Sequence, residues 1–249
     1  MKIDNKFLDP LYHKTPDEVL EVCCDFGSYR GIHAALLRRN QTWKNLKKFT
    51  LRLIHGHINS AECILGNTTW GALEELVLRS SYLSDKGVCI IKENNTWVNL
   101  RILNMSNNAI ADKGAIAIGS NKAWTKLEQL ILSENAIGDA GAIALGTNTV
   151  WKNLSKLDLF SNKIGNIGAD YIGRNETWIN LKTLSLADNA IGYKGLRALV
   201  AGPISAALNL YIISYRKRLN RERTFALLRN LEAERSRSNR FYALFPTIY

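Results

Sequence analysis

Residues 181–191 read LKTLSLADNAI, with leucine or isoleucine at the first, fourth, sixth and eleventh places. Side chains alternate between the two sides of a strand, so Leu184 and Leu186 share one side and the residues between them point to the other. Asn189 follows, and an asparagine amide can satisfy backbone groups that a turn leaves open. The stretch therefore predicts a short, half-buried strand that ends in an asparagine turn.

The same pattern returns at every twenty-seventh position, and tryptophans mark the interval. All six tryptophans of the protein follow it: Trp43, Trp70, Trp97, Trp124, Trp151 and Trp178. We number positions within a unit by their distance from its tryptophan, which is position 0. Large apolar residues stand at positions +3, +6 and +8 of every unit, and asparagine stands at position −3. A repeat of this length indicates a stacked array, because one unit alone cannot bury its apolar side.

The second half of each unit predicts a helix. Glycine recurs at position +17, as Gly87, Gly114, Gly141, Gly168 and Gly195. We expect this glycine to open a segment such as GAIALG, whose apolar residues recur at the spacing of one helical side. A strand and a helix in every unit predict an α/β solenoid, with a parallel β-sheet on one side and helices on the other.

The motif L-x-x-L-x-L-x-x-N-x-I resembles the leucine-rich-repeat signature, and a unit of this length with a full helix resembles the ribonuclease-inhibitor type. The resemblance covers roughly residues 16–215. It implies a curved horseshoe, with the parallel β-sheet on the concave face and the helices on the convex face. The T-W-x-N-L units also resemble repeats of the eukaryote-like effectors that intracellular bacteria deliver into host cells.

The sequence divides into three parts of one domain. Residues 1–42 are expected to form an N-terminal cap with a degenerate repeat, in which Val19, Val22 and Cys24 take the inward positions and residues 1–15 are irregular. Residues 43–202 are expected to form six repeats. Terminal units of such arrays depart from the consensus because one of their sides meets water.

The last part, residues 203–249, is expected to add one strand and a capping helix. Leu208, Tyr211 and Ile213 repeat the three inward spacings of a strand, and a charged, helix-prone segment follows. Its basic residues include Arg216, Lys217, Arg218, Arg221 and Arg223. We interpret this basic helix as a cap that covers the end of the solenoid. The alternative is that the helix binds nucleic acid or another anionic surface.

Composition argues against membrane and secreted classes. No run approaches about 18 apolar residues, as a membrane span requires, and no apolar run follows the N-terminal charges as in a secretory signal. Cys23, Cys24, Cys63 and Cys89 have no paired spacing, so we expect free thiols in a reducing compartment. The expected location is the cytoplasm, or the host cytosol if the protein is a secreted effector.

Neither glycosylation nor metal binding is expected. The Asn-x-Thr triplets coincide with position −3, where we expect asparagines to tie the loop before each strand. These triplets begin at Asn40, Asn67, Asn94 and Asn175. His55 and His57 could ligate a metal, but no third ligand has a recognisable spacing. The sequence also lacks phosphate-binding, nucleophile-elbow and zinc-protease motifs, so we expect neither an enzyme nor a cofactor.

Function is expected on the outward strand positions +5, +7, +9 and +10, which a sheet arranges as a regular grid. Ile102, Ile131 and Phe160 form a diagonal apolar stripe across this grid, and Val77 lies beside it. Contiguous exposed apolar groups favour a protein contact, with aromatic residues as anchors.

Charged residues complete the predicted site. Arg52 and Arg79 occupy neighbouring strands in one column, and Glu134, Asp158 and Asp188 lie toward the other end. A partner would therefore meet a basic end, an apolar middle and an acidic end. We predict a monomeric, non-catalytic scaffold that binds a partner protein on the concave strand face.

Overall fold

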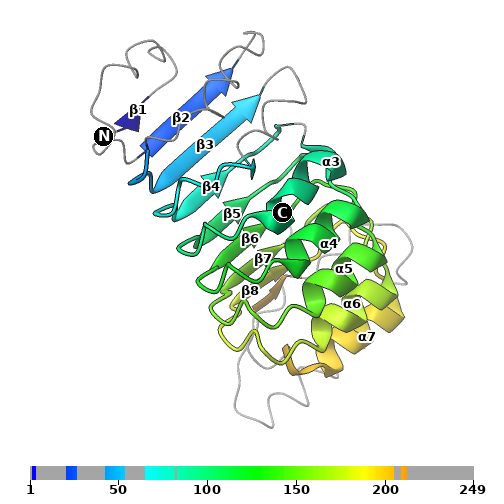
Figure 1. Ribbon diagram of the computed structural model, residues 1–249. Coiled ribbons are helices and arrows are strands. Elements are labelled where there is room, and N and C mark those ends of the chain that lie inside the picture. Colours follow the sequence, from blue (N-terminus) through cyan, green and yellow to red (C-terminus); the bar gives the residue numbers. More distant parts are fainter. Residues whose placement is uncertain are drawn as a thin grey trace.

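The computed structural model describes residues 2–3, 21–26, 43–53, 65–81, 83–204 and 209–211. Within these residues, nine strands form one parallel sheet in sequence order (Figure 1). The strands are β1 (Lys2–Ile3), β2 (Glu21–Phe26), β3 (Lys48–Leu53), β4 (Glu75–Val77), β5 (Ile102–Asn104), β6 (Gln129–Ile131), β7 (Lys156–Asp158), β8 (Thr183–Ser185) and β9 (Asn209–Tyr211).

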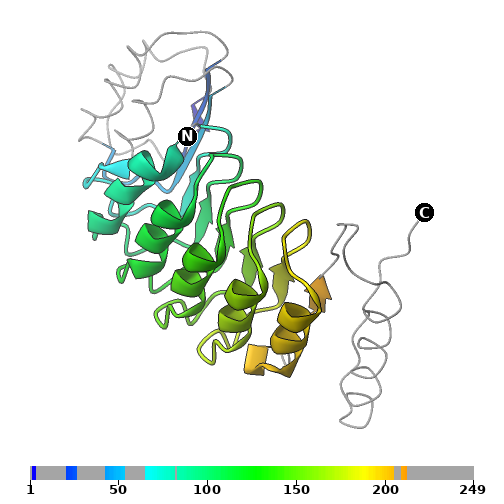
Figure 2. The same cartoon turned by 90° about the vertical axis from the view of Figure 1, so that its right-hand side faces the viewer.

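Helices form a second layer beside the sheet, one to each unit from Trp70 to Trp178 (Figures 1 and 2). They are α3 (Ser84–Cys89), continued by the 3₁₀ turn η4 (Ile90–Glu93), then α4 (Asp112–Ser120), α5 (Asp139–Gly146), α6 (Asn166–Gly173) and α7 (Tyr193–Ala201). Each helix packs on the helix of the next unit. The strand-and-helix alternation confirms the α/β solenoid that the repeat predicts.

Neighbouring units are joined in register, so equivalent positions pair across the sheet. Leu103 of β5 pairs with Leu76 of β4 and with Leu130 of β6, and this column continues to Leu184 of β8. The inward side chains at positions 0, +3, +6 and +8 of the six tryptophan units are at most 2% exposed. Each unit therefore extends one apolar core between the sheet and the helices.

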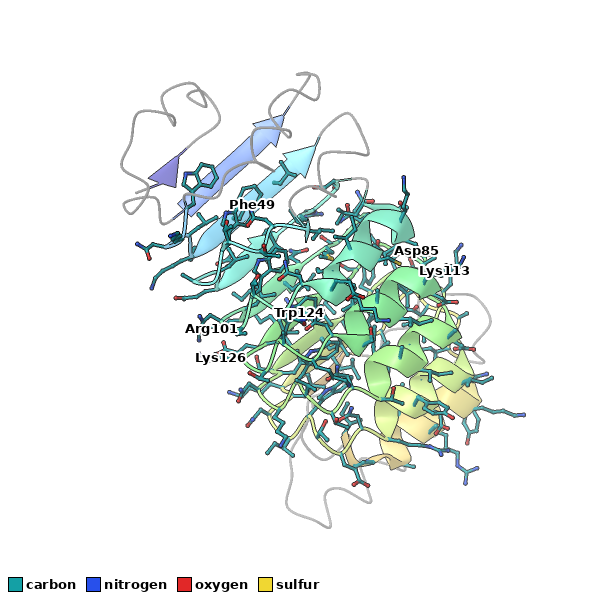
Figure 3. All side chains as sticks on the ribbon, in the orientation of Figure 1. Phe49, Asp85, Arg101, Lys113, Trp124 and Lys126 are labelled. Carbon is teal, nitrogen blue, oxygen red and sulfur yellow. The ribbon has the colours of Figure 1, made fainter. Side chains whose placement is uncertain are left out.

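The tryptophans form the largest buried column of this core. Trp43 stacks on Trp70 with ring centroids 6.3 Å apart, Trp151 stacks on Trp178 at 6.4 Å, and Trp124 lies in the interior (Figure 3). From Trp70 to Trp178, each indole N–H is buried and has no hydrogen-bond partner. An unpaired buried donor costs about 1–3 kcal/mol, so the apolar surface buried by each ring must offset that loss.

Asparagines at position −3 tie each unit to the one before it. The Nδ2 group of Asn94 donates to the carbonyls of Leu65 (3.1 Å) and Asn67 (2.9 Å), and its Oδ1 accepts the N–H of Thr96 (3.0 Å). Asn121, Asn148 and Asn175 make equivalent bonds. The expected loop-tying role is thus confirmed for these units.

A second column of asparagines, at position +11, closes the turn after each strand. Asn135 donates from Nδ2 to the carbonyl of Met105 (3.1 Å), and its Oδ1 accepts the N–H groups of Asn108 and Ile110 (both 3.0 Å). Asn108, Asn162 and Asn189 repeat this pattern. The prediction that these amides satisfy open backbone groups is confirmed.

A third polar column, at position +15, links the helices and was not predicted. The Oδ1 atom of Asp112 accepts the N–H groups of Gly138 and Gly141 in the next unit, both at 2.8 Å. These N–H groups belong to the start of α5, where a helix has no internal acceptors for its first donors. Asp85, Asp139 and Asn166 cap the following helices in the same way.

The glycine at position +17 has a different role from the one expected. It does not open the helix, because α4, α5 and α6 begin earlier, at position +15. A Cβ atom on Gly141 would lie 2.8 Å from the Cβ of Ala115 and 2.9 Å from Oδ1 of Asp112. The glycine is therefore needed so that one helix can approach its neighbour and the capping aspartate closely.

The N-terminal strands agree with the predicted cap register in part. Val22 and Cys24 of β2 pair with Phe49 and Leu51 of β3, which occupy inward positions, so the backbone register of β2 is the predicted one. The expectation that residues 1–15 are irregular is wrong at Lys2–Ile3, which forms β1 and pairs in parallel with β2. Val19 lies outside the described residues.

The last strand is shifted by a single position from the predicted register. Leu210, and not Tyr211, pairs with the inward Leu184, while Tyr211 pairs with Ser185 at an outward position. The prediction counted one full repeat forward from Leu184 to Tyr211, but no tryptophan marks this unit, and its chain is shorter than a full repeat. The other two predicted inward residues, Leu208 and Ile213, lie outside the described part of the chain, as does the predicted basic helix.

Candidate protein-binding site

The candidate site is the strand face, which we define as the outward positions +5, +7, +9 and +10 of the units. The parallel ladder extends beyond the short strands, since the N–H of Glu134 donates to the carbonyl of Phe160 (2.8 Å) and the N–H of Ser161 donates to that of Ala187 (2.9 Å). Positions +9 and +10 are consequently held by backbone bonds to the next unit. The face is a fixed frame rather than a set of free loops.

Register places the predicted apolar stripe on one diagonal of this frame. Ile102 pairs with Gln129, and Asn104 pairs with Ile131, so each apolar residue is offset by two positions from the one on the neighbouring strand. Phe160 follows on the same diagonal, two positions beyond Asp158, the partner of Ile131.

The four apolar side chains differ in how far they reach into solvent. Phe160 is 41% exposed, whereas Val77, Ile102 and Ile131 are half-buried. A large aromatic ring at this exposure leaves apolar area that a partner could cover. Phe160 is thus the most prominent apolar group of the predicted stripe.

An ion pair between two of the charged residues changes the charge distribution that was predicted for the strand face. Glu134 was placed at an acidic end apart from Arg79, but a carboxylate oxygen of Glu134 lies 3.7 Å from a guanidinium nitrogen of Arg79. The long side chains reach across the intervening unit, so a separate basic end at Arg79 and acidic end at Glu134 is wrong. The backbone of Arg52 belongs to β3, but its side chain lies outside the described part.

The other two predicted acids are engaged locally. The Oδ1 atom of Asp158 accepts the N–H of Phe160 (3.1 Å), which fixes the backbone beneath the aromatic ring. Asp188 accepts the hydroxyl of Ser161 through Oδ2 (2.8 Å). Both residues are half-buried on the strand face.

Position +4, at the N-terminal edge of the sheet, carries an ion-pair column that sequence reasoning missed. Lys47 pairs with Glu74 (3.1 Å), and Arg101, which Figure 3 labels, pairs with Glu128 (2.8 Å) in the next two units. The hydrogen bonds that Arg101 donates to Glu128 raise the pKa of Arg101, and the negative charge of Glu128 adds to the effect. Alternating charges at one position of the repeat were the available signal.

The described residues contain no group of three or more His, Cys, Asp or Glu side chains that could hold a metal ion. None of their helices has the length and apolar character needed to cross a membrane. His55 and His57 lie outside these residues, as do Arg216, Lys217, Arg218, Arg221 and Arg223 of the alternative basic surface.

Comparison with known proteins agrees with the repeat geometry. The family model described as "Leucine Rich repeat" matches residues 98–119, 125–146, 152–173 and 179–200. No curated protein matches the chain. Among solved structures, the chain is similar to an internalin (InlF) from Listeria monocytogenes, with 15% identity, coverage of 80% of this chain and 82% of that chain, and a TM-score of 0.25.

The assignment rests on the four matched segments and not on that distant likeness. The matched segments follow the frame set by the tryptophans, and each spans one strand and the helix after it. Domains of this type generally mediate protein–protein interaction and are typically non-enzymatic scaffolds. The four matched segments, together with the repeat geometry, support a leucine-rich-repeat protein.

Proposed function

We propose that this chain is a non-catalytic scaffold that binds a partner protein on its strand face, with Phe160 as the main anchor. The observation that carries the proposal is the exposed ring of Phe160 on a backbone held by hydrogen bonds on two sides. Its N–H donates to Asp158, and its carbonyl accepts the N–H of Glu134. A partner would therefore meet an ordered aromatic side chain.

Pre-organisation supports this use of the face. Binding loses free energy when loops and side chains must be ordered, and a frame that is already fixed avoids much of that loss. The half-buried Ile131 and Ile102 extend the apolar contact along the diagonal next to Phe160. Asp158 and Asp188 border it with carboxylates, which favour a partner with basic groups at the rim.

The proposal is tested with two strand-face variants and two matched controls. Ile131→Glu and Phe160→Ala change the strand face. Ile179→Glu and Val98→Ala change exposed apolar residues at position +1, outside the strand face, where Ile179 is 73% exposed and Val98 is 47% exposed. Each protein is immobilised and challenged with eukaryotic cytosol, because the resemblance to host-directed effectors points there, and captured proteins are then purified for affinity measurement.

We expect a partner that the wild type and both controls retain and that the folded strand-face variants lose. Truncating an aromatic anchor typically weakens binding by about 2 kcal/mol or more, so Phe160→Ala is expected to raise Kd at least about thirtyfold. Capture by all five proteins alike would contradict the proposal. Capture that nuclease or high salt abolishes would instead assign binding to the basic C-terminal segment.

A further inference from the structure

The outer side of the helix layer carries most of the exposed large apolar residues of the described chain. Seven such residues are at least 39% exposed, and four of them are on helices. These four are Ile116 of α4 (43%), Ile167 (59%) and Tyr171 (39%) of α6, and Tyr193 of α7 (43%). The predicted strand face contributes only Phe160. Sequence reasoning treated the helices only as a cover for the core and missed this concentration.

Exposed apolar residues extend from α4 across α5 to α6, and the three helices pack side by side (Figures 1 and 2). Equivalent positions of consecutive units are neighbours on adjacent helices, so Ile116 lies beside Ile143, and Tyr171 lies beside Ala144. Ala140 is the neighbour of Ile167 in the same way. The outward residues of α5 and its C-terminal end are uncharged throughout: Ala140, Ile143, Ala144 and Thr147. We call this surface the helix-face patch.

Cations border the patch, and its acid is already paired. Lys113 of α4 and Lys194 and Arg197 of α7 are exposed and make no ion pair within the described residues (Figure 3 labels Lys113). Asp170 of α6 is bound by Arg174 one helical turn later, with 2.6 Å between the charged groups. Three exposed cations therefore border the patch, beside the capping carboxylates of Asp112 and Asp139.

This charge pattern discriminates between occupants. Two copies of the chain packed through this patch would bring like charges together around an apolar centre, which costs free energy at an interface. A lipid surface would gain little from Ala140 and Ala144, because insertion energy scales with buried apolar area. A protein partner gains from them, since small side chains let a facing helix approach closely and seat its ridges between Ile116 and Ile167.

We propose that the helix-face patch docks an acidic amphipathic helix of a partner protein. The helix lays its apolar stripe across α4, α5 and α6, from Ile116 to Tyr171, and its carboxylates meet Lys113 of α4 and Lys194 and Arg197 of α7. Apolar anchors at helical spacing with complementary charge at the rim are the usual chemistry of such docking. This surface is separate from the strand face, so its use does not depend on the function proposed above.

The test selects helices by the charge of their flanks. A display library holds peptides of about 18 residues with a fixed leucine stripe at helical spacing and Glu or Lys at random in the flanks. Selection is carried out on the wild-type chain. The best peptide is then titrated against the wild type, Ile167→Glu and Ile179→Glu, and circular dichroism confirms that each variant is folded. Ile179→Glu is the matched control because Ile179 is also exposed but lies outside the helices.

We expect selected peptides with glutamate-rich flanks, an increase in Kd of about tenfold or more with Ile167→Glu, and less than about a twofold change with Ile179→Glu. Replacing Lys113 and Lys194 by Glu is expected to reverse the flank preference toward lysine. The proposal is overturned if no peptide is enriched, if flank charge is not selected, or if both isoleucine variants weaken binding equally.

Two further measurements cover the other occupants. The wild-type chain and Ile167→Glu are sedimented with phosphatidylcholine vesicles that contain or lack phosphatidylserine, and their molar masses are measured by light scattering. Sedimentation or dimerisation that Ile167→Glu abolishes would assign the patch to a membrane or to a second copy, and would overturn the peptide proposal. A wild-type chain that neither sediments nor dimerises through the patch supports it.

Discussion

The residue at position +10 turns the chain out of each strand, and its backbone conformation is the same in five units. Ser80, Asn107, Glu134, Ser161 and Asp188 all have φ between 51° and 58°. Left-handed backbone costs about 1–2 kcal/mol for most L-residues, and short polar side chains such as Asn and Asp tolerate it best. Glu134 has the longest side chain of the five, so we expect its left-handed backbone to be more strained than that of the other four residues.

Replacing Glu134 by Asn is therefore expected to stabilise the protein by about 0.5–1 kcal/mol. The lost pair with Arg79 offsets little of this gain, because both side chains are about half exposed and such pairs contribute under about 1 kcal/mol. Urea unfolding followed by circular dichroism measures the change. The reverse substitution, Asn107→Glu, serves as the control and is expected to destabilise by a similar amount. Equal stability of all three proteins would remove the argument from strain.

The aspartate at position +15 is the residue on which the start of the next helix depends. Asp112 accepts two N–H groups of the following unit, and no helical carbonyl is placed to accept them. Asn166 performs the same function with a neutral amide. The chain thus contains its own evidence that geometry matters here more than charge.

Asp112→Ala is expected to lower the free energy of unfolding by about 2–3 kcal/mol, since two hydrogen bonds are lost and their donors are left without acceptors. Asp112→Asn keeps the accepting oxygen and is expected to cost less than about 1 kcal/mol. Denaturant unfolding of the wild type and the two variants measures these differences in the free energy of unfolding. If Asn is as damaging as Ala, the carboxylate charge and not the accepting oxygen is responsible.

At the scale of the element, each helix is shaped by its neighbour more than by its own propensity. Glycine disfavours helices, yet α4, α5 and α6 each contain one at position +17 and another at position +22. A Cβ on Gly119 would lie 2.6 Å from the carbonyl oxygen of Ala144 in α5. The helices are consequently packed backbone to backbone at this point.

Gly119→Ala is expected to destabilise the protein by about 1–3 kcal/mol, because overpacking against a backbone outweighs the gain in helix propensity of about 1 kcal/mol. Gly71→Ala is the matched control, as nothing lies within 4 Å of a Cβ built there. Thermal or urea unfolding compares the two. If Gly119→Ala stabilised the protein, α4 and α5 would be able to move apart without a loss of stability, which would contradict the prediction.

The burial and hydrogen bonding of the asparagines before the strands explain why the glycosylation triplets occur in the sequence. Asn67, Asn94 and Asn175 are at most 7% exposed, and the amide of Asn94 is used on both its donor and acceptor sides. A sugar could not be attached to such an amide without breaking the bonds between units. The triplets at these three sites therefore reflect the repeat. Asn40 lies outside the described residues.

At the scale of the whole molecule, a buried core separates two different surfaces. The strand face is a frame of half-buried side chains around Phe160, and the helix-face patch is an area of exposed apolar residues bordered by three exposed cations. Between them lie the inward leucines and the tryptophan column, which are almost fully buried. The two proposed partners would therefore meet the chain on separate surfaces.

The two surfaces are expected to act independently. The double variant Ile131→Glu/Ile167→Glu should bind the strand-face partner as weakly as Ile131→Glu alone, and the selected acidic peptide as weakly as Ile167→Glu alone, each within about 0.5 kcal/mol. Isothermal titration of the single and double variants measures both affinities. A larger difference would indicate that the solenoid couples its faces.

Several features of the fold and the site could be predicted from residue spacing. The inward columns, the asparagine turns and the diagonal of Ile102, Ile131 and Phe160 follow from counting, because parallel strands in register bring position to matching position. Counting was wrong at Tyr211, where no tryptophan marks the unit. It also missed the aspartate caps, since it assigned position +17 to the start of the helix.

The periodicity of apolar residues by itself determined that this chain is a solenoid and which side chains face its core. Burial is a strong, repeated requirement, so every unit carries the same signal. Only the tertiary structure decided that Arg79 reaches Glu134 across an intervening unit, that glycines let α4 and α5 touch, and that Ile116, Ile167 and Tyr171 remain uncovered. Those features depend on the distance between stacked units and on the reach of each side chain, which a repeat pattern does not contain.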